Sequence, residues 1–75
     1  SDLPIPDENQ QYQLWMKKNG RQVSGGVFPV TSNGYAVVEI QSKESLSNFQ
    51  SFEITLEPTG GSITPGNYIV MVSHI

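Results

Sequence analysis

The chain has 75 residues, a formal net charge of −3 and 15% charged residues, with seven glycines and five prolines. This length allows one domain with a small core, and the composition favours a β-rich, turn-rich fold over a helical one. The acidic balance argues against nucleic-acid binding, which needs a basic face, and the absence of cysteine excludes disulfides and thiolate metal sites.

Residues 1–11 (SDLPIPDENQQ) contain two prolines and three acids and show neither strand nor helix periodicity. Pro4 and Pro6 each lack a backbone donor and disfavour helix in the residue before them. We therefore expect a flexible extended stem over residues 1–11 and a β-domain over residues 12–75. No apolar run approaches the roughly 20 residues that cross a bilayer, and no signal peptide is visible. Because the chain begins with SDLPIP and lacks an initiator Met, we expect it to be a trimmed piece of a longer protein.

Residues 12–28 (YQLWMKKNGRQVSGGVF) predict a β-hairpin. From Tyr12 onward, apolar and other residues follow the period of two that is typical of a strand, so successive side chains are expected on opposite sides. Asn19-Gly20 is the strongest short hairpin signal because a type I′ turn needs positive φ at both positions. Gly25-Gly26 predicts a bulge or a close backbone approach, and Pro29 ends the ladder or places it at an edge.

The middle of the chain predicts a turn at residues 31–34 (TSNG), a strand at 35–40 (YAVVEI) and a short helical turn within 42–50. We expect Ser42 to cap this turn, and Leu46 and Phe49 to hold it against the core.

Two further strands are expected near the C-terminus. Residues 51–57 (SFEITLE) alternate, so we expect Phe52, Ile54 and Leu56 to face the core and Glu53, Thr55 and Glu57 to face water. Residues 67–74 (NYIVMVSH) are apolar on both faces, which predicts a central strand. The expected fold is all-β, a small antiparallel sandwich or open barrel of about five to six strands with at most one short helical turn.

The glycine-rich stretch at residues 57–66 (EPTGGSITPG) raises the question of phosphate binding. A phosphate loop needs a helix after it and a Lys after its second glycine, whereas here a strand follows and no Lys or Arg lies beyond Lys43. The spacing also fails the dinucleotide fingerprint. The sequence therefore predicts a connection between two antiparallel strands.

The opening strand with Leu14-Trp15, the Gly-Val-Phe segment, the NGYAVVEI strand and the Glu57–Ser62 stretch (EPTGGS) together resemble the C-terminal domain of the anti-sigma-K factor family. The resemblance runs from about Tyr12 to Val72. It implies a non-catalytic regulatory domain of a single-pass membrane protein whose cytoplasmic segment holds an extracytoplasmic-function sigma factor inactive.

From this resemblance we expect the protein in the cell membrane, with this domain on the extracytoplasmic side. The expected partners are the sigma factor, through a missing cytoplasmic segment, the membrane, through a missing upstream helix, and an envelope protease at the stem. The family's metal-binding and sigma-binding residues lie in the missing part, so the resemblance assigns none of them to this chain.

The residues suggest no catalytic, cofactor or metal site. His74 is the only histidine, and no serine has a basic partner in the sequence that would mark a nucleophile. Glu53 and Glu57 on one strand are interpreted as ordinary solubility charges rather than a glycosidase pair. Lys17, Lys18 and Arg21 crowd the predicted hairpin turn, either as a solvated tip or as an anion-binding spot.

The aromatic residues leave two alternatives open. Trp15, Tyr35 and Tyr68, with Tyr12, either build the small core or form an interaction surface on which sugar rings or a peptide stack. The second alternative makes the chain a carbohydrate- or peptide-binding module of the cell envelope that uses Trp15 and Tyr68.

Overall fold

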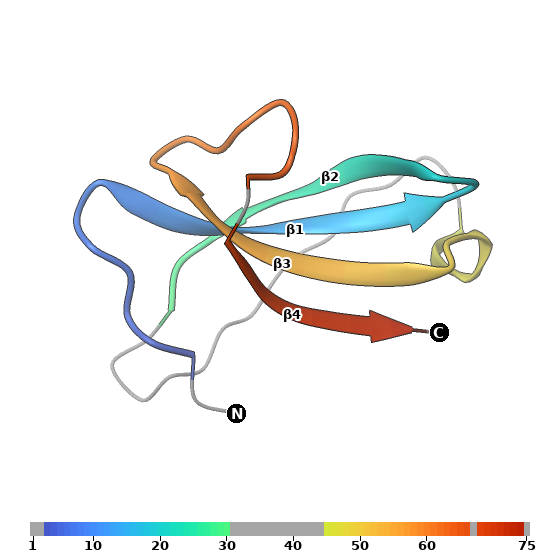
Figure 1. Cartoon of the computed structure of the whole chain (residues 1–75), viewed down its shortest axis with the longest axis horizontal. Coiled ribbons are helices and arrows are strands. Elements are labelled where there is room, and N and C mark those ends of the chain that lie inside the picture. Colours follow the sequence, from blue (N-terminus) through green and yellow to red (C-terminus); the bar gives the residue numbers. More distant parts are fainter. Residues whose placement is uncertain (1–2, 31–44, 67, 75) are drawn as a thin grey trace.

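The computed structural model describes residues 3–30, 45–66 and 68–74. The described strands form one open antiparallel sheet in the order β2-β1-β3-β4, which confirms the all-β class (Figure 1). The elements are β1 (Gln10–Lys18), β2 (Arg21–Phe28), the 3-10 helix η1 (Leu46–Asn48), β3 (Ser51–Pro58) and β4 (Ile69–His74). The turn expected at residues 31–34, the strand at 35–40 and the Ser42 cap lie outside the described residues. None of the helices in the described part of the chain is long and apolar enough to span a membrane.

The β1–β2 hairpin turns at Asn19-Gly20, as predicted. Asn19 has φ 52° and Gly20 has φ 78°, the positive values that a type I′ turn requires. The flanking pair is Lys18 with Arg21, so the turn contains two residues.

A bulge interrupts β2 at the predicted Gly-Gly pair. Leu14 pairs with Gly26 and Trp15 pairs with Ser24, which leaves Gly25 as the extra residue. A Cβ atom on Gly25 would lie 3.0 Å from Leu14 Cδ2, so the close approach expected from the sequence is also present. β2 ends at Phe28, immediately before Pro29, as expected.

One face of the sheet carries the apolar core. Tyr12, Leu14 and Phe28 are buried, and the rings of Tyr12 and Phe28 stack with centroids 6.0 Å apart. The partly buried residues around them come from all parts of the described chain: Leu3, Val30, Phe52, Ile54, Leu56 and Val70. The prediction that Phe52, Ile54 and Leu56 face the core is confirmed.

The other face of β3 corrects the sequence-based expectation. Thr55 is 0% exposed and Glu57 is 3% exposed, so the prediction that these residues face water is wrong. The reason is that the loop between β3 and β4 folds back over this face and contacts Glu57 through Ser62 and Gly66. Glu53 is half-buried, and its carboxylate accepts a hydrogen bond directly from the side chain of Gln22 on β2 at 3.0 Å.

Two further expectations need correction. Among the described strands, β4 lies at one end of the sheet order rather than in the centre, and a register shift marks its pairing with β3. In the helical turn, Phe49 is buried as predicted, but Leu46 is 40% exposed and does not hold the turn to the core. The N-cap is Ser45, whose side chain accepts from the Ser47 backbone.

Residues 3–9, which we call the N-terminal segment, contact the sheet. Leu3 packs against the core, and the Tyr12 hydroxyl donates to the Pro4 carbonyl at 2.7 Å. A turn closed by Gln10 N–H to Asp7 C=O, at 2.9 Å, leads into β1. β1 begins two residues before the domain boundary expected between residues 11 and 12, and that boundary stays a prediction.

Candidate functional site

The three aromatic residues proposed as an interaction surface lie in different surroundings. Trp15 is 1% exposed, so its ring is covered, whereas Tyr68 is 67% exposed. Tyr35 lies outside the described residues. Tyr68 and Tyr12 line the same open cavity beside the N-terminal segment, and Trp15 is not among its lining residues. The described structure therefore does not bring Trp15 and Tyr68 together as a stacking platform.

Trp15 instead begins a chain of buried hydrogen bonds. Its indole N–H donates to Thr55 Oγ1 at 2.8 Å, and the Thr55 hydroxyl donates to Glu57 Oε2 at 2.5 Å. Trp15 lies on the face of β1 opposite Tyr12, because successive side chains of a strand point to opposite faces. The buried indole thus has a partner, as a desolvated donor requires.

Glu57 is the end of this chain and an anchor for the loop that follows it. Besides Thr55, the carboxylate accepts from the Ser62 hydroxyl at 2.8 Å and from the Gly66 N–H at 2.7 Å. Burial raises the pKa of Glu57, but the hydrogen bonds from Thr55, Gly66 and Ser62 stabilise the charged form, and the net pKa lies below its ordinary value. At neutral pH, Glu57 is therefore a charged acceptor.

Residues 59–66, which we call the double-glycine loop, also bond to alternate side chains of β1. Gly60 N–H donates to Gln11 Oε1 at 2.9 Å, and Ser62 N–H donates to Gln13 Oε1 at 2.8 Å. Gln13 Nε2 donates in turn to the Ser62 carbonyl at 3.1 Å. The loop therefore runs along one face of β1. Its backbone groups bond to the side-chain amides of β1, as the backbone of a paired strand would bond to the backbone of its neighbour.

The double glycine serves this close approach. Gly60 and Gly61 have φ 93° and 88°, and a Cβ on Gly61 would lie 2.8 Å from Val27 Cγ1 and 2.9 Å from Gln13 Oε1. Only glycine fits such a position without a shift of its neighbours. The glycines turn the chain and allow it to lie against β1 and β2, in agreement with the connecting role predicted from the sequence.

The double-glycine loop also reaches the N-terminal segment. Thr59 N–H donates to the Asn9 carbonyl at 3.0 Å, and the Thr59 hydroxyl makes a long hydrogen bond of 3.5 Å to the Glu8 carbonyl. Figure 1 shows this loop, in orange, leaving the same end of the sheet at which the blue N-terminal segment enters β1. The double-glycine loop thus contacts both β1 and the N-terminal segment that precedes β1.

This arrangement supports anchoring rather than acid–base chemistry. Both oxygens of the Glu57 carboxylate accept hydrogen bonds within the protein. Among the described residues, no group of three or more His, Cys, Asp or Glu side chains could hold a metal ion, and no buried side-chain nitrogen or oxygen lacks a hydrogen-bond partner.

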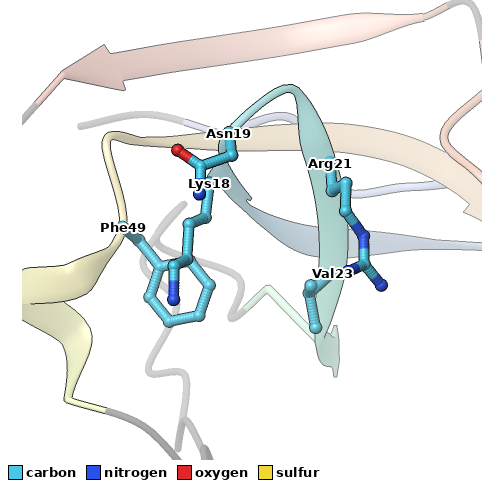
Figure 2. A pocket seen from close by; sticks show the side chains of 5 residues that line it. All are labelled: Lys18, Asn19, Arg21, Val23 and Phe49. Atoms are coloured by element: carbon cyan, nitrogen blue, oxygen red, sulfur yellow. The ribbon is translucent and has the colours of Figure 1, made fainter.

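Two of the three cations near the hairpin turn, Lys18 and Arg21, border an open cavity of about 250 Å³. Figure 2 shows Arg21 and Val23 on β2 on one side of this cavity and Lys18 with the buried ring of Phe49 on the other. Lys17 is exposed, and its carbonyl accepts from Gln50 N–H at 2.7 Å, which joins the hairpin to the end of η1. Both alternatives for these cations, a solvated tip and an anion-binding spot, stay predictions.

The family comparison agrees with the resemblance drawn from the sequence. A family model described as anti-sigma-K factor rskA, C-terminal, matches residues 1–68. The chain belongs to this family. No curated protein matches the chain, and no solved structure matches it. In this anti-sigma-K factor C-terminal domain, the matched residues include the N-terminal segment and the double-glycine loop, and they end just before β4.

Sequence reasoning missed the residues that anchor the loop in this anti-sigma-K factor domain. Gln11, Gln13 and Trp15 recur at every second position of β1, and each makes a hydrogen bond on the same face. Their period of two was a usable signal, because amides and an indole on one strand face need partners once that face is covered. Nothing in the periodicity identified the partners, which lie some 40 or more positions along the chain.

Proposed function

We propose that this chain is the extracytoplasmic, non-catalytic regulatory domain of a transmembrane anti-sigma factor. Family membership supports a regulatory anti-sigma role, and it implies a sigma factor as partner of the whole protein. To this regulatory role the proposal adds an orientation across a membrane and control by proteolysis.

The proposed mechanism is control of protease access to the residues that precede β1. The observation that carries it is the contact of the N-terminal segment with the folded sheet through Leu3 and the Tyr12–Pro4 hydrogen bond. A protease needs an extended, accessible substrate, and cleavage follows the population of opened chain when opening is fast. Folding of the sheet therefore lowers cleavage of this segment, and loss of folding raises it.

The experiment compares cleavage of the full-length membrane protein with the β-domain folded, unfolded or deleted. Leu14→Asp places a charge in the apolar core and unfolds the domain, and removal of residues 12–75 serves as the second variant. Cleavage within residues 1–11 is expected to rise in both, whereas the exposed substitution Arg21→Gln leaves it unchanged. Equal cleavage in all four proteins would contradict the shielding mechanism.

The proposed orientation has a separate test. The chain contains no cysteine, so Thr64→Cys, on the exposed part of the double-glycine loop, provides one thiol in a full-length protein otherwise free of cysteine. A membrane-impermeant maleimide added to intact cells is expected to label it. Labelling that requires lysis of the cells would place the domain on the other side and refute the proposed location.

A further inference from the structure

Two separate anchors hold the N-terminal segment on the sheet. At one end, Leu3 packs beside the core and the Pro4 carbonyl accepts from Tyr12. At the other end, the carbonyls of Glu8 and Asn9 accept from Thr59 in the double-glycine loop. The second anchor therefore depends on the conformation of a loop about 50 residues away in the sequence.

We propose that the double-glycine loop is a clasp that keeps the N-terminal segment docked, so that a change in this loop releases the segment while the sheet stays folded. The inference rests on the proposed function for its biological meaning, because the released segment would be the protease substrate. The docking itself is a property of the chain and is measurable without a sigma factor or a membrane.

The loop is suited to this role because its position is set by contacts other than those to the segment. Glu57, Gln11 and Gln13 hold it by side-chain hydrogen bonds to Gly66, Gly60 and Ser62. Thr59 lies at the start of the loop, in the turn closed by Gly61 N–H to Pro58 C=O at 2.8 Å. Displacement of the loop from β1 therefore moves Thr59 away from its two acceptors.

The segment has few other contacts that could hold it once the clasp opens. Pro4 and Pro6 lack the backbone donors that a strand would use, and Ile5 is 61% exposed. An open cavity of about 190 Å³ borders the segment, and its lining includes Pro4, Ile5 and Pro6 from the segment together with Leu56, Tyr68 and Val70. Regions with little buried apolar surface open at low free-energy cost.

The Tyr12 anchor is stable across neutral pH. Burial, and to a smaller extent the neighbouring Tyr68, raises the pKa of the Tyr12 hydroxyl above its usual range, so the hydroxyl remains a donor to Pro4. Changes in the loop are thus a more accessible means of release than titration of this tyrosine.

The test uses the purified 75-residue chain and a matched pair of glycine substitutions. Gly60→Ala and Gly61→Ala introduce the same strain at positive φ, but only Gly61→Ala brings a Cβ against Val27 and Gln13, while the Cβ of Gly60→Ala meets nothing within 4 Å. Native-state cleavage by proteinase K is mapped by mass spectrometry. Cleavage within residues 3–9 is expected to be about fivefold faster in Gly61→Ala than in Gly60→Ala. Amide exchange of Thr59, whose N–H bonds to Asn9, is expected to rise with it.

A milder pair guards against failure to fold. Ser62→Ala removes the hydroxyl donor to Glu57, and Ser62→Thr keeps a hydroxyl at the same position. Segment cleavage is expected to rise in the first variant and to return toward the wild-type rate in the second. Amides in the centre of β1, such as that of Leu14, are expected to stay protected in both.

Three results would overturn the inference: equal segment cleavage in the two glycine variants, no effect of Ser62→Ala, or a parallel loss of protection at Leu14, which signals global unfolding. If the loop variants release the segment in the isolated chain but cleavage of the full-length membrane protein does not change, the clasp stands and the proposed shielding function fails.

Discussion

Glu57 accepts hydrogen bonds from three donors that come from β3 and the double-glycine loop, and it is almost fully buried. Its neighbour Glu53 lies on the same strand face but is half-buried and bonds to Gln22 at the surface. Two carboxylates four residues apart therefore differ in what surrounds them, and substitution at each should give a different result.

Glu57→Gln is expected to lower the free energy of unfolding by about 1–3 kcal/mol, because the amide replaces a charged acceptor and places its own donor among three donors. Glu53→Gln, the matched control, is expected to change it by no more than about 0.5 kcal/mol. Urea denaturation followed by circular dichroism measures both. A cost at Glu53 equal to that at Glu57 would contradict the anchoring role.

The lowered pKa of Glu57 predicts a pH dependence of stability. Because the folded-state pKa lies below the unfolded-state value, its contribution is present above the ordinary pKa of 4.5 and is lost as pH falls through the folded-state pKa. The urea midpoint of the wild type is therefore expected to fall more steeply below about pH 4.5 than that of Glu57→Gln. Parallel curves for the two proteins would show that another group dominates.

The turn of the β1–β2 hairpin and the double-glycine loop both depend on residues with positive φ. In the hairpin, Gly20 has φ 78° and open space around the position of a Cβ, so an L-residue there meets strain but no neighbour. In the loop, Gly61 has both strain and a close neighbour. The hairpin thus isolates the backbone effect from the packing effect.

Gly20→Ala is expected to destabilise the domain by about 1–2 kcal/mol, the cost of left-handed backbone for an L-residue. Chemical synthesis of this short chain with D-alanine at position 20 is expected instead to stabilise it by about 0.4–1 kcal/mol, since the native φ suits a D-residue and the unfolded chain loses freedom. Thermal unfolding of the three proteins distinguishes these results. Destabilisation by both residues would mean that the turn tolerates no Cβ at all.

Across the molecule as a whole, the segment and the sheet should open at different free energies. Release of the N-terminal segment exposes Leu3 and its contact with the core, which is less apolar surface than unfolding of the sheet exposes at Trp15 and the core around Tyr12. The dependence on urea scales with the surface exposed. Cleavage within residues 3–9 is therefore expected to depend weakly on urea.

Trp15 fluorescence and far-ultraviolet circular dichroism are expected to follow one common transition at higher urea, because the indole is buried against the central strands. The measurement is the urea dependence of native-state proteolysis compared with that of the two optical signals. Cleavage that follows the optical transition would show that the segment opens only with the sheet, and would remove the basis for the clasp.

Much of the fold could be read in advance because local chemistry specifies it. The Asn19-Gly20 turn, the bulge at Gly25 and the core side of β3 each follow from the residues at those positions and their neighbours. The family resemblance rested on equally local motifs around Trp15 and the double glycine. Turn geometry and strand alternation act over a few residues, so a sequence displays them directly.

The burial of Thr55 and Glu57, the hydrogen-bond partner of Trp15 and the contact of Thr59 with Asn9 could not be read in this way. Alternation tells which side chains share a strand face, but it does not tell what covers that face. Here the double-glycine loop, which directly follows β3, folds back over that face, and the polar residues become anchors instead of a solvated surface. Coverage depends on how remote segments meet in space, because burial and hydrogen-bond satisfaction are properties of the assembled fold.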